Sequence, residues 1–156
     1  MAKHLHDFLA RATQKASADL EAALLRLPAD KRNWSPMGDA RTALDMVAEC
    51  ALMNGNTADL IQTRVFPADF DWAAFGRAKT ELAQNRDALL SLLHANTQKV
   101  IAALNAVAEE DLNVAVPMPW GPMALSEVMA YPYWNMSYHE GQINYIAALL
   151  PRGDDR

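Results

Sequence analysis

Three polar residues stand out within an otherwise apolar stretch near the C-terminus. Asn135 and His139 are four residues apart and Gln142 follows three residues later, so on a helix all three side chains share one face. The imidazole of His139 offers a neutral nitrogen ligand for a metal ion, or a group for acid–base chemistry. The same spacing fits a core histidine whose nitrogens are satisfied by a carbonyl or a carboxylate. Both interpretations stay open on spacing alone.

The other reactive side chains lack a partner at ligand spacing. His4, His6 and His94 have no second histidine at such a distance, so surface or hydrogen-bonded roles are expected for them. The single cysteine, Cys50, has apolar neighbours and is predicted to be an interior thiol, which excludes an internal disulfide and a thiolate metal cluster. Trp120 lies in a proline-rich loop, from which it could line the mouth of a pocket.

Composition narrows the classes of partner. The chain has 156 residues and a net charge of −5, from 14 basic and 19 acidic residues, so nucleic acid is not an expected partner. It has no window of about 20 apolar residues that would span a membrane and no signal peptide at its start, so a cytoplasmic location is expected by default. Its apolar fraction of 51% permits a homodimer without requiring one.

Four segments carry apolar residues at three- and four-residue steps, which predicts four helices. The segment 108–123 contains Pro117, Pro119 and Pro122 and is expected to be a loop, because proline cannot continue a helix. These features predict an all-α, four-helix bundle with long crossover loops, forming one domain over residues 1–156. The predicted helices span residues 3–27, 39–64, 72–107 and 124–150. Asp39 or Ala40 is expected to open the second helix and Asp71 to cap the third. Any break in the third helix is expected near Asn96, and Pro132 is expected to kink the fourth.

Several motifs resemble the DinB-like (DinB/YfiT-like) family. They are Leu27-Pro28 followed by Trp34-Ser35-Pro36, the helical segment Arg41–Ala51, and the closing segment Tyr138–Ile146. The resemblance covers nearly the whole chain and implies a four-helix bundle. It also implies a divalent metal held between one histidine of the second helix and an H-x-x-x-H pair of the fourth. Some relatives act as transferases or isomerases that depend on low-molecular-weight thiols.

Transferred residue by residue, the family pattern matches this chain only in part. His139 coincides with the second histidine of the pair, whereas Asn135 replaces the first and Glu49 replaces the histidine of the second helix. The resemblance thus implies metal ligands at Glu49, Asn135 and His139, with His139 and Glu49 as catalytic groups. Such a set would suit manganese, iron or magnesium, with nickel or zinc as further candidates.

The alternative is a site without metal. Glu49 would then bond His139 directly and form a buried acid–base pair. On spacing alone Glu49 is expected to face solvent, because it shares a polar stripe with Asp45, Asn56 and Asp59, and the family alignment turns it inward. Two functions follow: a DinB-like protein with a degenerate pocket for a small molecule or thiol, or an active metal-dependent, thiol-dependent transferase or isomerase. Whether the chain is an enzyme stays open.

Overall fold

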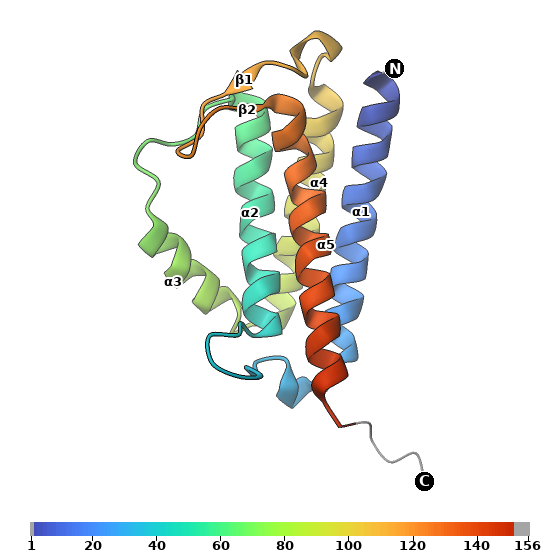
Figure 1. Cartoon of the computed structure of the whole chain (residues 1–156), viewed down its shortest axis with the longest axis vertical. Coiled ribbons are helices and arrows are strands. Elements are labelled where there is room, and N and C mark those ends of the chain that lie inside the picture. The colour runs from blue at the N-terminus through green and yellow to red at the C-terminus, as the bar shows by residue number, and fades with distance from the viewer. Residues whose placement is uncertain (1, 152–156) are drawn as a thin grey trace.

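The computed structural model describes residues 2–151, with side chains from residue 4 onward. Helices dominate this part of the chain (Figure 1). A short antiparallel hairpin, β1 (Ala115–Val116) with β2 (Met123–Ala124), lies between the last two helices. The helices are α1 (Ala2–Arg26), α2 (Ala43–Thr63), α3 (Trp72–Leu82), α4 (Arg86–Ala106) and α5 (Leu125–Leu149), with single 3-10 turns at Ala29–Lys31 and Glu109–Asp111.

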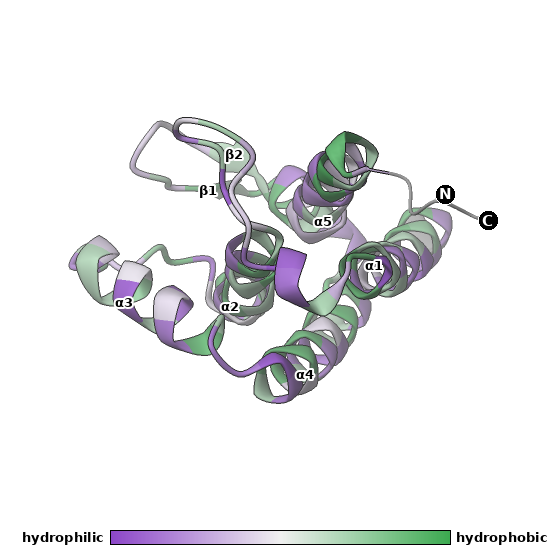
Figure 2. Ribbon diagram, turned by 90° about the horizontal axis from the view of Figure 1, so that it is seen from below, coloured by the Kyte–Doolittle hydropathy of each residue, from purple (hydrophilic) through white to green (hydrophobic). Residues whose placement is uncertain are grey.

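Four of the helices form the bundle that the apolar spacing predicts. Helix α2 packs against α4 and α5, and α1 packs against the same two helices from the other side. Seen along the bundle, the four helices surround a common interior, and α3 lies outside them beside α2 (Figure 2). Helix α3 contributes no buried residue, so it is an addition to the bundle and not part of its core. The prediction of an all-α, four-helix architecture is confirmed.

A buried polar layer separates the core into two apolar clusters. In this layer Asn54 donates to Oγ1 of Thr97 at 3.2 Å, and Thr97 in turn donates to Oγ of Ser17 at 3.2 Å. The amide of Asn96 donates to the carbonyl of Ala51 at 2.8 Å and lies against Gly55. These bonds join α1, α2 and α4 at one level of the bundle and satisfy groups that would be costly to bury alone.

The long helix predicted over residues 72–107 is two helices, so that prediction is wrong in its detail. The chain leaves the helix after Leu82 and re-enters it at Arg86, where the side chain of Asn85 accepts from the amide of Ala88 at 3.1 Å. Asn85 is therefore an N-cap. Asn96, where a break was expected, is buried inside α4 because its side chain finds a partner on α2.

The predicted start of the second helix is wrong, whereas the predicted cap of the next helix is confirmed. The second helix begins at Ala43 and not at residue 39 or 40, because Oγ1 of Thr42 accepts from the amide of Asp45 at 3.2 Å and caps it. Asp71 caps α3 as predicted, accepting from the amide of Ala74 at 2.8 Å. None of the helices in residues 2–151 is both long and apolar enough to cross a membrane.

Candidate functional site

His139 lies in the C-terminal half of α5 and is almost fully buried, with 4% of its surface exposed. Its Nδ1 atom is 2.6 Å from Oε1 of Gln142, one turn further along the same helix. Its Nε2 atom is 3.1 Å from Oε1 of Glu49 on α2. A carboxylate only accepts, so Nε2 carries the proton of this contact. Both ring nitrogens are therefore engaged by oxygen atoms from two helices.

Glu49 bridges the imidazole and a guanidinium group. Its side chain is 20% exposed, and its second oxygen, Oε2, lies 2.7 Å from Nη1 of Arg41, which precedes α2. Burial alone would raise the pKa of this carboxyl group, but the hydrogen bond from His139 and the charge of Arg41 outweigh it and lower the pKa to about 2. Glu49 is accordingly an anion at neutral pH.

The ion pairs continue from Arg41 outward to α3. Arg41 donates through Nε to Oδ2 of Asp45 at 2.5 Å, and Nζ of Lys79 on α3 lies 3.1 Å from Oδ1 of the same carboxylate. We call the chain His139, Glu49, Arg41, Asp45 and Lys79 the charge network. It connects the buried imidazole of α5 to α3, which lies outside the bundle.

Asn135 is buried one turn before His139, but it belongs to a different contact. Its Nδ2 atom donates to Sγ of Cys50 at 3.6 Å, and no hydrogen bond within the described part of the chain joins it to Glu49 or His139. Burial raises the pKa of the Cys50 thiol, and the nearby charge of Glu49 adds to this effect, so the sulfur stays protonated. The structure thus brings together two of the three candidate residues, Glu49 and His139.

This donor set does not fit a divalent cation. Zinc sites in proteins have at least three ligand side chains. Among residues 4–151, no three His, Cys, Asp or Glu side chains gather closely enough to hold a metal ion. The two donors that do meet, on Glu49 and His139, are bonded to each other, and the cationic Arg41 already lies beside the carboxylate. A second cation at this point would meet electrostatic repulsion.

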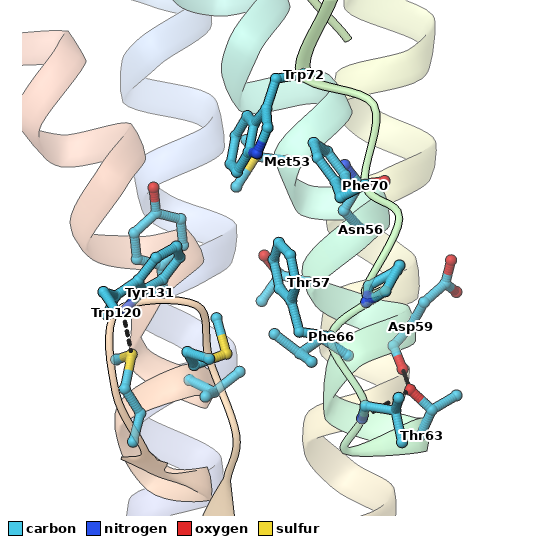
Figure 3. Close-up of a pocket in the computed structure, with 16 residues that line it drawn as sticks. Met53, Asn56, Thr57, Asp59, Thr63, Phe66, Phe70, Trp72, Trp120 and Tyr131 are labelled. Carbon is cyan, nitrogen blue, oxygen red and sulfur yellow. Dashed lines mark hydrogen bonds between the residues drawn. The ribbon is translucent and has the colours of Figure 1, made fainter. Parts of the chain in front are cut away.

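A cavity of about 370 Å³ opens between α2 and α5 (Figure 3), and its lining begins at Met53, one helical turn after Glu49 on α2. The segment between α2 and α3, the start of α3 and the hairpin close its other sides. Asp59 is the only charged residue at its wall, and its carboxylate points away from the aromatic side chains. The lining residues are Met53, Asn56, Thr57, Asp59, Leu60, Thr63, Val65, Phe66, Pro67, Phe70, Trp72, Met118, Trp120, Met123, Val128 and Tyr131.

Tyr131 connects the cavity to the charge network. It lines the cavity from α5, and its hydroxyl points toward the end where Met53 lies, one helical turn after Glu49 on α2 (Figure 3). Burial raises the pKa of the Tyr131 phenol, and the negative charge of Glu49 raises it further. Because Met53 lies one turn from Glu49 on α2 and Tyr131 lies about two turns from His139 on α5, this end of the cavity faces the charge network.

Sequence reasoning missed most of these contributors. Arg41 and Asp45 stand eight and four residues before Glu49, and this helical spacing was a signal that the three charges share one face. No sequence pattern indicated that Lys79 would pair with Asp45, because this contact depends on how α3 folds back against α2. The aromatic residues Phe66, Phe70 and Trp72 form a dense run that ends at the first residue of α3. Trp120 also lines the cavity, as its loop position suggested.

The sequence profile of the DinB superfamily matches residues 12–143. The chain belongs to the DinB superfamily. The matched range includes α2, α4 and most of α5, and so contains every residue of the charge network and the whole wall of the cavity. A comparison of this DinB-superfamily sequence with functionally curated proteins gave no match.

Solved structures share the fold of this DinB-superfamily chain at low sequence identity. YfiT from Bacillus subtilis, described as a probable metal-dependent hydrolase with an unusual four-helix bundle topology, is 16% identical, with a TM-score of 0.76 over 95% of this chain and 89% of that one. A mycothiol-dependent maleylpyruvate isomerase is 12% identical, with a TM-score of 0.73 over 88% of this chain. The match spans only 60% of the isomerase's own length. The colibactin self-resistance protein ClbS, solved with double-stranded DNA, is 15% identical with a TM-score of 0.65 over 94% and 97%.

Proposed function

We propose that this DinB-superfamily chain binds a small organic molecule in the cavity between α2 and α5. The charge network next to this cavity is proposed to hold its carboxylates and imidazole in place without a metal ion. The observation that carries the proposal is an apolar cavity whose lining includes Met53, one helical turn from Glu49 on α2, and Tyr131 on α5. Ligand pockets are typically apolar concavities of about 300–1,000 Å³ with a few polar groups at one end. The cavity has this composition.

The engagement of His139 and Glu49 supports binding over catalysis. Both nitrogens of the imidazole face oxygen atoms, and each oxygen of the carboxylate faces a donor. A general base needs a free lone pair within reach of the proton that it removes. In this arrangement the imidazole and the carboxylate are already engaged by partners within the protein. The network instead fixes α5 against α2 and sets a polar boundary to the cavity.

A neutral fluorescent dye tests the binding proposal directly. N-phenyl-1-naphthylamine emits strongly only in apolar surroundings, so its fluorescence reports occupation of the cavity. Met53→Trp fills the cavity and is expected to weaken dye binding by at least about ten-fold, since overpacking removes the space for the ring. Met37→Trp, at a position that is 84% exposed, is the matched control and should bind as the unmodified chain does. Equal binding by both variants would refute the cavity as the site.

Metal analysis separates this proposal from its alternative, an active metal-dependent and thiol-dependent transferase or isomerase. After expression with added manganese, iron, nickel and zinc, we expect no stoichiometric metal in the purified chain and no metal-dependent rise in its melting temperature. His139→Ala is expected to cost about 1–3 kcal/mol of stability through lost buried hydrogen bonds while dye binding persists. Thiol-transfer activity abolished by the same substitution would favour the alternative.

Double-stranded DNA, which ClbS binds in its complex, should not bind this acidic chain.

A further inference from the structure

The chemistry of the cavity wall constrains what can occupy it. Its aromatic rings pack against one another, with centroids of Phe70 and Trp72 4.5 Å apart, those of Phe66 and Phe70 5.5 Å apart, and those of Phe66 and Trp120 6.0 Å apart. The indole nitrogen of Trp120 donates to Sδ of Met123 at 3.4 Å, so the donor of that ring is used within the wall. Such a surface of ring faces, ring edges and thioethers suits a planar apolar molecule.

The charges around the cavity disfavour an anion. No lysine, arginine or histidine lines it, and the carboxylate of Asp59 points away from it (Figure 3). The cations nearest along the charge network, Arg41 and Lys79, are paired with Glu49 and Asp45. A carboxylate or phosphate that entered the cavity would lose its hydration and gain no cationic partner, which is a large cost.

Two of the lining residues carry hydroxyl groups on opposite walls of the cavity. Thr57 comes from α2 and Tyr131 comes from α5 (Figure 3). The Tyr131 hydroxyl has no hydrogen-bond partner among the described residues, although its ring is half-buried and lies 5.7 Å from that of Trp134. A half-buried phenol without a protein partner is a natural contact for one polar group of a bound molecule.

We infer that the cavity selects an uncharged aromatic molecule with one hydrogen-bonding group, which meets the hydroxyl of Tyr131, and that it rejects anions of the same shape. The inference rests on the proposed function and adds the class of ligand to it. The rings of the wall hold the apolar body of the ligand. Its polar group lies at the end of the cavity nearest to Glu49 and His139.

A series of naphthalene derivatives of nearly equal shape tests this selectivity by isothermal titration calorimetry. The probes are naphthalene, neutral 2-naphthol, anionic 2-naphthoate and cationic 2-naphthylmethylammonium. We expect 2-naphthol to bind tightest and 2-naphthoate to bind at least about ten-fold more weakly, because the carboxylate is desolvated without a partner. Tyr131→Phe should reduce the affinity for 2-naphthol to that for naphthalene and leave naphthalene binding unchanged.

Tyr145→Phe is the matched control, because Tyr145 is on the same helix, is 68% exposed and does not line the cavity. It should leave every affinity as it is. Tight binding of 2-naphthoate or of the ammonium probe, or an unchanged affinity for 2-naphthol in Tyr131→Phe, would overturn the inference while cavity binding itself stands. Failure of all four probes to bind would instead remove the proposed function. Circular dichroism of both variants verifies that each is folded.

Discussion

The Nη1 atom of Arg41 lies 2.7 Å from Oε2 of Glu49, on the oxygen that His139 leaves free. The carboxylate is thus held between a guanidinium group and an imidazole, and the guanidinium supplies positive charge where the family pattern implies a metal ion. Buried ion pairs are costly to assemble, and removing one partner is more costly still, because the other charge is left without compensation. The three side chains therefore depend on one another.

Acid should selectively remove the contribution of Glu49 to stability. The pKa of this group is about 2 in the folded chain, against an ordinary value of 4.5. Its stabilisation is therefore present above about pH 4.5 and is lost as the pH falls from there through 2. Measured by urea denaturation, we expect the pH-dependent difference between the unmodified chain and Glu49→Gln to be on the order of 2–3 kcal/mol at pH 7 and to narrow at pH 3.

Glu81→Gln is the control for the loss of one negative charge, since Glu81 is exposed on α3. It should leave the stability difference small at both pH values. A difference between the unmodified chain and Glu49→Gln that stayed constant from pH 7 to pH 3 would show that the carboxylate is not ion-paired as described.

Introducing imidazoles at positions 49 and 135 should create a three-histidine metal site. The double variant Glu49→His with Asn135→His places three histidines where the family pattern has them and removes the carboxylate that pairs with Arg41. We expect nickel or zinc to raise its melting temperature and to leave that of the unmodified chain unchanged, because binding to the folded state alone stabilises it. Asn135→His alone is the control. An equal rise for the unmodified chain would contradict the metal-free site.

Two helical glycines should respond oppositely to alanine. A Cβ at Gly55 would lie 2.7 Å from Nδ2 of Asn96, which is bound to the carbonyl of Ala51, whereas a Cβ at Gly141 would meet nothing within 4 Å. We expect Gly55→Ala to destabilise the chain by about 1–3 kcal/mol through overpacking. Gly141→Ala should stabilise it by about 0.5–1 kcal/mol through helix propensity. Chemical denaturation of both variants measures the difference, and equal signs would contradict the close approach of α2 and α4.

Helix α3 should be held to the bundle by Lys79 more than by its other basic residue, Arg77. Lys79 pairs with Asp45 of α2, whereas Arg77 lies 3.9 Å from Asp71 at the start of its own helix. Lys79→Met is expected to speed amide hydrogen exchange in α3 several-fold, since a partly exposed pair is worth about 0.5–1 kcal/mol. Arg77→Met should change it little. Identical exchange in both variants would show that the pair does not hold the helix.

The sequence predicted the bundle because its apolar spacing and its prolines act locally. Helix α1 and helix α5 end within about one residue of their predicted bounds, and Asp71 caps its helix as expected. The break before Arg86 was hidden because Leu82 and Leu89 continue the seven-residue apolar spacing across it. A capping asparagine decided the point, which periodicity does not detect.

The candidate site was less accessible to such reasoning. The pairing of Glu49 with His139 was one of the alternatives considered from the sequence. The stripe of polar residues on α2 argued against it, because such a stripe is typical of a face exposed to solvent. The stripe was misleading because one face of a helix can change from solvent to pocket along its length. Asn135 was grouped with His139 by spacing, yet its amide contacts Cys50, the residue next to Glu49 on α2. The cavity depends on how two loops fold over α2 and α5, and no local pattern encodes that.

The buried thiol of Cys50 can serve as a native probe for the separation of α5 from α2. Its sulfur is fully buried between α2 and the amide of Asn135, and its raised pKa keeps it unreactive in the closed bundle. A thiol-directed reagent can therefore modify this single cysteine only while α5 has separated from α2. The rate of that modification, followed under native conditions, would count the openings of the interface beneath the cavity without any introduced label.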